Sequence, residues 1–487
     1  MKLPTELAAK IRATGGDELV DRLERLESMR EQPRRPAKTG RSQALRAPDH
    51  AAHTDYDVVV AGGGLSMLIA PLLAGMGLRV GLFERNRAGT SHREWNASGP
   101  ELRPLRDSGL FSAAEVEAMV VARYRHGLCR WHGGGSYPVR GVLDHAVDAA
   151  SLLGLTRARA LERGVEIFDG HAVVDEAYGK SGAVIQVRGE DGQVRDVTAR
   201  VLVDGRGAAS PHAKADLLCP TVGGVMRGLR RGDAPDEMDP EVGDILATTE
   251  DVEQGRQHIW EAFPGRPGET TVYLFYYART EEIPPGALAA LYQRFFELRP
   301  RYKQGDAELL RPTFGYIPGW SRLRPGPRAP GGSCLLLGDA AARQSPLTYC
   351  GFGNMLRSFT PAAQGIAEAL ASARRVIDSE AILPDAPIHA GTGALAMMMA
   401  VPPRAPSQAH AVNALLDVAF DSLHQMGNEA YAALLKDEME PAQFITFLRQ
   451  AAQRYPRVYG EVFARLGAFA TGRWGFNLLR SRLRSAA

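Results

Sequence analysis

The chain contains few cysteines, and they are not paired in sequence. Its four cysteines, Cys129, Cys219, Cys334 and Cys350, form no CxxC pair among 487 residues. A disulfide framework is therefore not expected, and the pattern favours a reducing compartment. The twelve histidines show neither an HxH nor an HExxH spacing. We therefore predict that the protein has no metal site.

The sequence also lacks a marked excess of one charge. It carries 58 basic and 56 acidic residues, a formal net charge of +2. A dedicated nucleic-acid binder would show a basic excess, so we expect no nucleic-acid partner.

Long apolar runs are absent as well. No uncharged apolar stretch reaches the roughly 18 residues that a membrane-spanning helix needs, and residues 394–403 come nearest. The first residues have no apolar core of the kind found in a secretory signal. We expect a cytoplasmic protein that is soluble or attached to the membrane surface.

The first informative pattern is a strand–turn–helix–strand unit over residues 56–84. A buried strand (56–61) precedes Gly62, Gly63 and Gly64, and a helix follows that starts at Leu65 and Ser66. Glycines at such a turn let phosphate oxygens approach backbone N–H groups at the helix N-terminus. Glu84 ends the second strand 22 residues after Gly62, where a carboxylate can bind a ribose, and Arg85 follows it. Met67 replaces the third glycine of GxGxxG, but the unit as a whole predicts dinucleotide binding.

Two later strand ends extend this pattern. Asp204 and Gly205 follow a strand near 194–203, and Gly338 and Asp339 follow a buried strand near 335–337. This order resembles flavoproteins of the p-hydroxybenzoate-hydroxylase type. The resemblance implies that the Asp339 carboxylate binds the ribityl chain of FAD and that the helix beginning near Gly353 points its positive end at the reduced flavin.

We therefore predict an α/β fold with a Rossmann-like FAD-binding domain of the glutathione-reductase type, an inserted β-sheet substrate domain and a C-terminal helical region. The chain is too long for one simple core. We divide it into an N-terminal helical segment broken at Gly15-Gly16, a flexible basic linker, three FAD-binding parts, a mixed segment, a substrate sheet and the helical region. The N-terminal helical segment is 1–29 and the linker is 30–54. The FAD-binding parts are 55–135, 201–215 and 331–375. The mixed segment is 136–200, the substrate sheet is 216–330 and the helical region is 376–487.

Beyond these motifs the chain resembles the CruA/CruP-type FAD-containing lycopene cyclases. Four stretches carry the resemblance: HREWNAS (92–98), IWEAFPG with TTVYLFYYA (259–278), FGYIPGW (314–320) and GDAAARQSPLTYCGFGNMLRS (338–358). Ala342 and Cys350 depart from it, because each stands where the family usually has glycine. The resemblance further implies that Arg93, Pro346, Gly351, Phe352 and Gly353 lie at the flavin.

The resemblance implies acid-catalysed, non-redox cyclisation of a linear polyene such as lycopene, with reduced FAD and an external reductant. Such chemistry needs a carboxylic acid that burial keeps protonated. Glu94 and Glu261 are the candidates, because each is flanked by aromatic residues. Either could instead be structural, Glu94 by pairing with Arg93 and Glu261 by facing solvent. Alternation along the strand places Glu261 on the same face as Ile259 and Phe263, which favours burial.

Aromatic residues near these acids could stabilise a carbocation or line the substrate site, although such residues more often belong to a core. The candidates are Trp95, Trp260, Phe263, Tyr273 and Phe275.

Two other functions remain open. One is a flavin-dependent monooxygenase or halogenase of secondary metabolism. Against it, Pro211 follows Ser210 where a monooxygenase carries arginine, and we find no second βαβ unit for NAD(P)H. The other is a carotenoid-binding flavoprotein without catalysis. A carotenoid resides in the membrane, so we expect peripheral attachment through residues 394–425 or through the arginine-rich segment 468–487.

Overall fold

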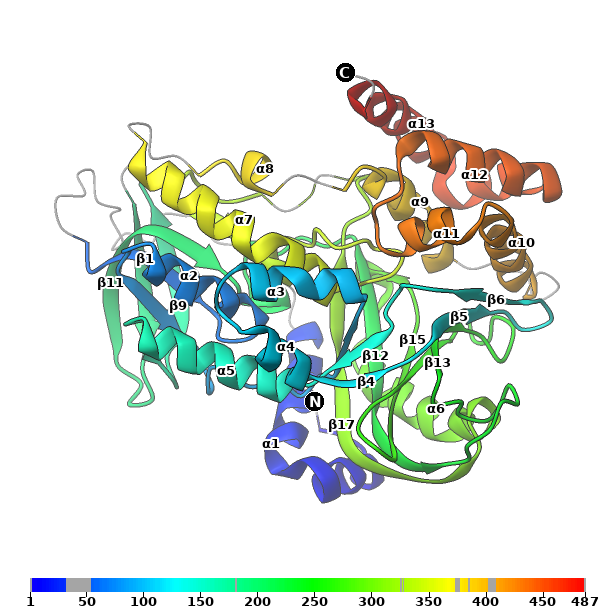
Figure 1. Ribbon diagram of the computed structural model, residues 1–487, viewed down its shortest axis with the longest axis horizontal. Helices are drawn as coiled ribbons and strands as arrows, with labels where there is room; N and C mark the ends of the chain where they lie inside the picture. The colour runs from blue at the N-terminus through cyan, green and yellow to red at the C-terminus, as the bar shows by residue number, and fades with distance from the viewer. Residues whose placement is uncertain are drawn as a thin grey trace.

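The computed structural model describes residues 2–31, 54–179, 182–324, 326, 328–372, 377–383, 386–401 and 409–485. The linker that the sequence suggests for residues 30–54 lies almost wholly outside the described residues. Figure 1 shows a nucleotide-type α/β layer on one side, a second β-sheet beside it, and a group of helices at the C-terminal end.

The first sheet has seven strands in the order β8-β2-β1-β11-β10-β9, with β18 also paired to β11. The strands that run parallel are β1 (Tyr56–Ala61), β2 (Val80–Phe83), β8 (Glu166–Phe168), β18 (Cys334–Leu336) and the C-terminal half of β11 (Val194–Asp204). The antiparallel strands β9 (Ala172–Tyr178) and β10 (Ala183–Arg188) extend the sheet along the other half of β11. The strands β1, β2 and β18 are almost fully buried and apolar, as parallel strands covered on both faces require.

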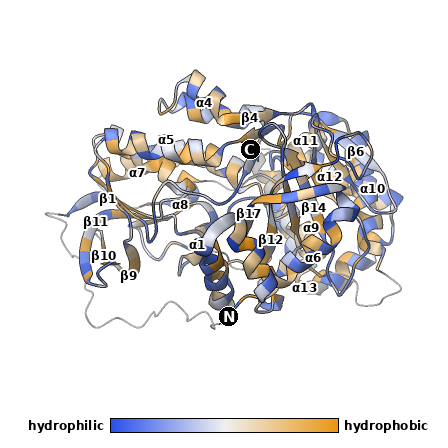
Figure 2. Ribbon diagram, turned by 90° about the horizontal axis from the view of Figure 1, so that it is seen from below, coloured by the Kyte–Doolittle hydropathy of each residue, from blue (hydrophilic) through white to orange (hydrophobic). Residues whose placement is uncertain are grey.

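Three helices cover one face of this sheet and form a common core with it. They are α2 (Ile69–Gly75), which follows the short helix η1 (Leu65–Leu68), α5 (Ala149–Glu162) and α7 (Gly351–Ala371). Helix α5 begins at Asp148, whose carboxylate accepts hydrogen bonds from Ala150 N and Ser151 N. Hydrophobic and hydrophilic residues occur along α5 (Figure 2), and the residues that this helix buries are Ala149, Leu152, Leu153, Thr156 and Ala160.

The second sheet has eight strands in the order β16-β12-β15-β14-β13-β5-β6, with β17 also paired to β12. Its strands are β5 (His126–Arg130), β6 (Ser136–Val139), β12 (Leu217–Leu229), β13 (Val242–Ala247), β14 (Ile259–Pro264), β15 (Glu269–Phe275), β16 (Ala278–Arg279) and β17 (Gly305–Gly319). Strand β5 pairs with β13, so residues 126–135 belong to this sheet. The sequence instead predicts them as the end of the first FAD-binding part.

Both faces of the second sheet are covered. Helix α6 (Ala287–Tyr302) and helix α1 (Thr5–Glu31) pack on one face, and helices from the C-terminal region pack on the other. A small third sheet consists of β3 (Trp95–Ala97), β7 (His145–Val147) and β4 (Val120–Arg123), and β5 and β6 of the second sheet come between β4 and β7 in the sequence. Short helices join its strands: η2 (Gly99–Leu102), α3 (Arg103–Asp107) and α4 (Ala113–Met119).

Helix α1 changes direction at Gly16, which has φ 69° and ψ −179°, where the sequence predicts a break. Its second half is fixed to α6 by one carboxylate. Glu27 is fully buried and accepts hydrogen bonds from Gly286 N (2.9 Å), Leu288 N (2.7 Å) and Ala289 N (3.1 Å). Tyr316 Oη also donates to Glu27, at 3.0 Å. A carboxylate at a helix N-terminus satisfies the free N–H groups and the positive end of the dipole, so Glu27 joins the N-terminal segment firmly to the second sheet.

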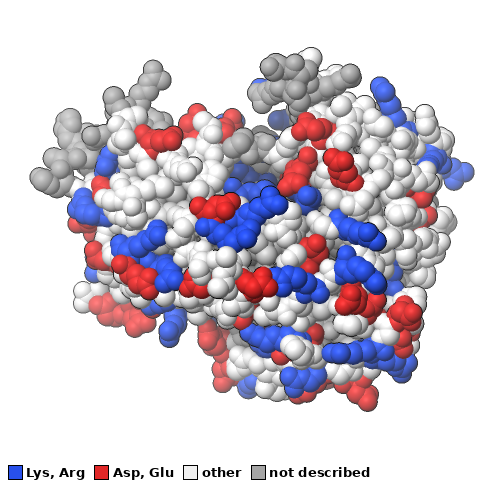
Figure 3. Space-filling view, viewed as in Figure 1, with Lys and Arg blue, Asp and Glu red and all other residues white. Residues whose placement is uncertain are grey.

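The C-terminal region is helical, as the sequence predicts. It contains α8 (Ser379–Ile382), α9 (His389–Ala400), α10 (Ala411–Gln425), α11 (Asn428–Leu435), α12 (Pro441–Arg454) and α13 (Val458–Ser485). Within the described ranges, no helix combines the length and the hydrophobicity that crossing a membrane requires. Charges of both signs are interspersed over the face of the molecule in Figure 3.

Candidate cofactor and active site

The carboxyl ends of three neighbouring strands form the base of the site. Ala61 at the end of β1 is level with Asp204 at the end of β11, and Asp204 is level with Leu336 of β18. The turns that follow them are therefore adjacent. Gly62 has φ 110°, and a Cβ atom on it would lie 2.6 Å from Gly205 O, so this close approach of two turns requires glycine.

The first glycine turn is closed by Glu84. Gly63 N donates to Glu84 Oε2 at 2.8 Å, and Asn86 N donates to Oε1 at 2.9 Å. A Cβ atom on Gly64 would meet no atom within 4 Å, so the space above this residue is open. The turn thus has an open side, which continues into η1 at Leu65 and Ser66.

Asp204 plays a different part from the one expected. Its side chain is fully buried and accepts hydrogen bonds from Ser210 Oγ (2.6 Å) and from Arg206 N (3.1 Å) and Nη2 (2.8 Å). Arg206 also pairs with Glu176, and the Glu176 carboxylate lies 2.8 Å from His212 Nε2. Although burial raises the pKa of Glu176, His212 and Arg206 lower it to about 2. The Asp204 carboxylate is therefore held inside an ion-pair network, and the backbone of Gly205 and Arg206 faces the neighbouring glycine turn.

Asp339 lies between the end of β18 and the start of α7. Its Oδ1 accepts a hydrogen bond from Gln344 Nε2 at 3.2 Å, and a Cβ atom on Gly351 would lie 3.6 Å from the same oxygen. Burial raises the pKa of Asp339, while Arg93 and the Gln344 hydrogen bond lower it. Within the described residues Oδ2 has no hydrogen-bond donor, so one carboxylate oxygen is available to a ligand at the N-terminus of α7.

Gly353, by contrast, is required by the protein itself. A Cβ atom on Gly353 would clash with the buried Glu101 carboxylate, which accepts a hydrogen bond from Ser98 N at 2.9 Å and pairs with Arg357. This packing accounts for the glycine at position 353, and the expected approach of Gly353 to the flavin stays a prediction. Phe352 stacks on Trp95, with ring centroids 4.9 Å apart, and so joins the start of α7 to β3.

Pro346 and Arg93 both lie against β17. Pro346 Cβ would be 3.1 Å from a Cβ atom on Gly319, and the Arg93 guanidinium occupies the space beside Gly315. His92, next to Arg93, contacts Phe314 O through Nε2 at 2.8 Å. Burial, followed by the charges of Arg22 and Arg93, lowers the pKa of His92 to about 3.

Three arginines, Arg22, Arg85 and Arg93, lie near this point. Among the described residues, none of them forms an ion pair with a carboxylate. Burial, followed by the neighbouring charges of Arg93 and Arg85, lowers the pKa of Arg22 to about 10, although Glu84 raises it. Arg22 belongs to α1, which packs on β17 and α6. Arg22 and Arg93 are half-buried, whereas Arg85 is exposed. A group of arginines of this kind can bind an anion such as a phosphate. No sequence signal pointed to Arg22, because it lies in a charged helix far from the glycine motifs.

Glu261 is the acid with the most perturbed surroundings at the second sheet. It lies on β14 opposite Tyr273 of β15, and Asn96 Nδ2 donates to its Oε1 at 2.9 Å. Burial raises the pKa of Glu261 to about 7, although the Asn96 hydrogen bond lowers it. Phe263, two residues along the same face, packs with Tyr124 and Tyr273. The sheet therefore presents, beside aromatic rings, a carboxyl group that is about half protonated at neutral pH.

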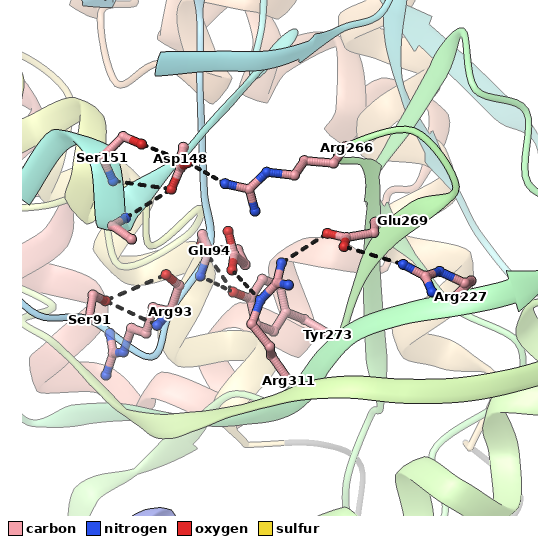
Figure 4. Close-up of polar contacts among 11 residues, drawn as sticks. Ser91, Arg93, Glu94, Asp148, Ser151, Arg227, Arg266, Glu269, Tyr273 and Arg311 are labelled. Atoms are coloured by element: carbon pink, nitrogen blue, oxygen red, sulfur yellow. Dashed lines mark hydrogen bonds and ion pairs between the residues drawn. The ribbon is translucent and has the colours of Figure 1, made fainter. Parts of the chain in front are cut away.

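Glu94 lies in a charged pocket. Its Oε1 accepts from Arg311 Nε at 3.3 Å, and its backbone N–H donates to Tyr273 Oη at 3.2 Å. Burial raises the pKa of Glu94, and Arg311 lowers it. In Figure 4 the Arg93 side chain points away from this group, whereas Arg266 and Arg311 point into it. The pocket is lined by acidic, basic and apolar residues. They are Glu94, Trp95, Val121, Ala146, Val147, Asp148, Val225, Phe263, Gly265, Arg266, Glu269, Thr271 and Arg311.

Two of the aromatic candidates are placed elsewhere. Trp260 is fully buried on the opposite face of β14, where its ring stacks on Tyr302 at 4.6 Å between centroids. It belongs to the core with α6, which corrects the expectation that it lines the substrate site. Phe275 packs in the core between the second sheet and the C-terminal helices. Trp95, Phe263 and Tyr273 remain beside Glu94 and Glu261.

No protein-family model matches the chain, and no curated protein matches it. Solved structures do match. Halogenase PltM in complex with phloroglucinol and FAD has a TM-score of 0.57 at 13% identity, over 87% of this chain and 96% of that one. A triple mutant of the flavin-dependent brominase Bmp2 has a TM-score of 0.52 at 17% identity, over 82% and 100%. A geranylgeranyl bacteriochlorophyll reductase-like protein from Thermoplasma acidophilum has a TM-score of 0.53 at 16% identity, over 84% and 98%.

These similarities confirm the predicted fold class, and they do not reach the CruA/CruP family, which stays a prediction. The chain has the fold of FAD-dependent flavoproteins, with a Rossmann-type domain and a substrate-domain sheet.

Proposed function

We propose that the chain is an FAD-dependent enzyme of the flavin monooxygenase and halogenase type. The observation that carries the cofactor assignment is the meeting of three parallel strand ends with the N-terminus of α7. The open side of the turn at Gly64 and the free carboxylate oxygen of Asp339 fit a dinucleotide whose phosphates lie at the first turn and whose ribityl chain lies at the second. Bound FAD would supply electron transfer and, in its reduced state, reactivity toward dioxygen.

The charged pocket supports this enzyme type over a lycopene cyclase. A polyene requires a dry, apolar cavity, whereas Glu94, Arg266 and Arg311 place charged groups around the pocket. Hydrogen-bonding groups of both signs suit a polar or hydroxylated substrate. The halogenase with a TM-score of 0.57 was solved with phloroglucinol, a polar aromatic molecule, which agrees with this substrate class.

Glu261 would act as the general acid or base, although it does not itself line the charged pocket. It is joined to the pocket through Tyr273, which lies opposite Glu261 and whose hydroxyl donates to Glu94 O at 3.0 Å. A carboxyl group with a pKa of about 7 can hold a proton and release it at neutral pH. The Asn96 hydrogen bond fixes the orientation of its Oε1, and Tyr273 on the next strand bounds the site. An external reductant would keep the flavin reduced.

The test begins with the purified protein and its extracted cofactor, identified by absorbance and mass. Oxygen uptake is then measured with reduced flavin and a panel of phenolic substrates, with and without chloride or bromide. We expect oxygen uptake that depends on substrate, and a hydroxylated or halogenated product. Asp339→Ala should lower FAD affinity, and Glu308→Gln, an exposed carboxylate on β17, serves as the control. A chain that binds no FAD would contradict the proposal.

A second candidate function is the acid-catalysed cyclisation of a linear carotenoid, which the raised pKa of Glu261 favours. It differs from the first in needing no oxygen. Incubation with lycopene and reduced FAD under anaerobic conditions would give ring formation without oxidation, read by absorbance and by an unchanged product mass. A product that appears only in air supports the first candidate.

A further inference from the structure

The last helix, α13 (Val458–Ser485), has two apolar faces. Its inner face carries an apolar residue at every fourth position, and these residues pack on the core between the second sheet and the C-terminal helices: Val462, Leu466, Ala470, Trp474 and Leu478. Gly467, with φ 76° and ψ 166°, interrupts the helical backbone between Leu466 and Ala470. The spacing therefore places Val462 and Leu466 on one side of the first part of α13, and Ala470, Trp474 and Leu478 on one side of the second part. The inner face is sufficient to hold α13 on the rest of the protein.

The outer face is apolar as well, and it is exposed. The described residues include eleven exposed large hydrophobic side chains, and six of them lie on α13: Tyr459, Phe463, Phe469, Phe476, Leu479 and Leu483. Phe469 is 80% exposed and Leu483 is 72% exposed. We call these six residues the outer face of α13. Tyr459 and Phe463 precede the break at Gly467, and the other four follow it. By helical spacing Phe469, Phe476, Leu479 and Leu483 share one side of the second part of α13. Soluble proteins expose single hydrophobic residues often, but such a row of large ones marks a contact surface.

The charge beside the outer face has one sign. Residues 468–487 contain four arginines and no aspartate or glutamate. Arg473 and Arg480 are exposed and, at the spacing of an α-helix, flank the row formed by Phe469 and Phe476. Arg482 and Arg484 follow in the sequence. Aromatic and leucine side chains with arginines alongside are the composition of helices that lie in a lipid interface.

The other segment considered for membrane contact does not offer such a surface. Residues 394–400 of α9 are nearly all buried, with Ala396 and Ala400 fully so. The apolar residues of α10, including Leu416 and Phe420, face the core. The described parts of the expected range, 394–401 and 409–425, therefore give no support to membrane contact there, and residues 402–408 lie outside the described residues. The remaining candidate is α13.

We propose that the outer face of α13 docks on the surface of an anionic lipid bilayer. The six apolar side chains would enter the boundary between headgroups and acyl chains, and the arginines would contact anionic headgroups. Figure 1 shows α13 at the edge of the molecule, with its second half extending toward the C-terminus. A second copy of this chain is a poorer occupant, because a symmetric contact would bring two sets of arginines together.

The proposal is tested by co-sedimentation of the full chain with vesicles. We expect binding to vesicles of phosphatidylcholine mixed with phosphatidylglycerol, and binding at least tenfold weaker to phosphatidylcholine alone. The triple variant Phe469→Ser, Phe476→Ser, Leu483→Ser should lose binding more than tenfold. The variant Arg473→Glu, Arg480→Glu should lose the preference for phosphatidylglycerol.

The matched control is Val174→Ser with Val194→Ser, which removes two exposed hydrophobic residues from the first sheet. It should bind vesicles as the wild type does. Because all substituted positions are exposed, the variants should keep the wild-type melting temperature, and this is checked by circular dichroism. Equal binding by the wild type and the triple variant would overturn the proposal. A wild-type dimer that the triple variant converts to a monomer would also overturn it, in favour of a second copy.

Discussion

Replacement of Glu261 by glutamine should remove a stability cost that grows with pH. The folded protein holds the pKa of this carboxyl at about 7, against an ordinary 4.5, because burial disfavours its charge. The folded state therefore keeps the proton between those two values while the unfolded chain releases it. At about 1.4 kcal/mol per pH unit, the wild type loses about 3 kcal/mol of stability from this group as pH rises from about 4.5 to about 7.

The comparison is made by urea unfolding of the wild type and Glu261→Gln at pH 5 and pH 8. At pH 5 the two should differ little. At pH 8 the variant should be more stable than the wild type by about 2 to 3 kcal/mol, since glutamine can still accept the Asn96 hydrogen bond. Other titrating groups contribute equally to both proteins and cancel in the difference. Glu308→Gln should show no such change with pH. A constant difference between the wild type and Glu261→Gln would refute a buried, neutral carboxyl at this position.

Other substitutions test the remaining features. Arg22→Ala should weaken FAD binding about tenfold in a flavin-fluorescence titration, whereas Arg25→Ala, an exposed arginine on the same helix, should not. Glu27→Gln should lower the free energy of unfolding by at least ~2 kcal/mol, because a neutral amide replaces the carboxylate at the start of α6, and an unchanged urea midpoint would contradict that role. Ala342→Gly should stabilise the protein by about 1 kcal/mol, because Ala342 has φ 48°, and a loss of stability would show that its conformation is not strained. His92→Asn should make the protein less sensitive to acid. The pKa of His92 is about 3 in the folded state, so its contribution to the free energy of unfolding is present above pH 6.5 and is lost as pH falls. Equal unfolding of both proteins at pH 4 would argue against this.

The nucleotide-type half of the fold could be predicted from sequence, because its signals are local. Each strand is a short apolar run that ends in glycine, and adjacent parallel strands bring those glycines together, as Gly62 and Gly205 are. The second sheet could not be predicted in the same way. Strand β12 pairs with β17 between residues about ninety positions apart, as at Thr221 and Gly315, and no local pattern fixes such a register.

The site could be predicted only in part. One wrong prediction, that Trp260 lines the substrate site, conflicts with the sequence pattern itself. Side chains alternate along a strand, so Trp260 and Glu261 cannot face the same site, and the rule that favoured burial of Glu261 also places Trp260 in the core. Arg22 and the role of Glu101 at Gly353 could not be predicted, because both depend on contacts between distant segments.

The capping of α6 by Glu27 also has a consequence for synthesis of the protein. Glu27 and Gly286 are separated by 259 positions. At ribosomal rates of about 5 to 20 residues per second, α1 emerges roughly 13 to 50 seconds before the helix that it caps. During that interval the apolar side of α1 has no sheet to cover it. Helix α1 is thus made well before α6 and β17, the elements on which it packs, and it can dock only after both have been made.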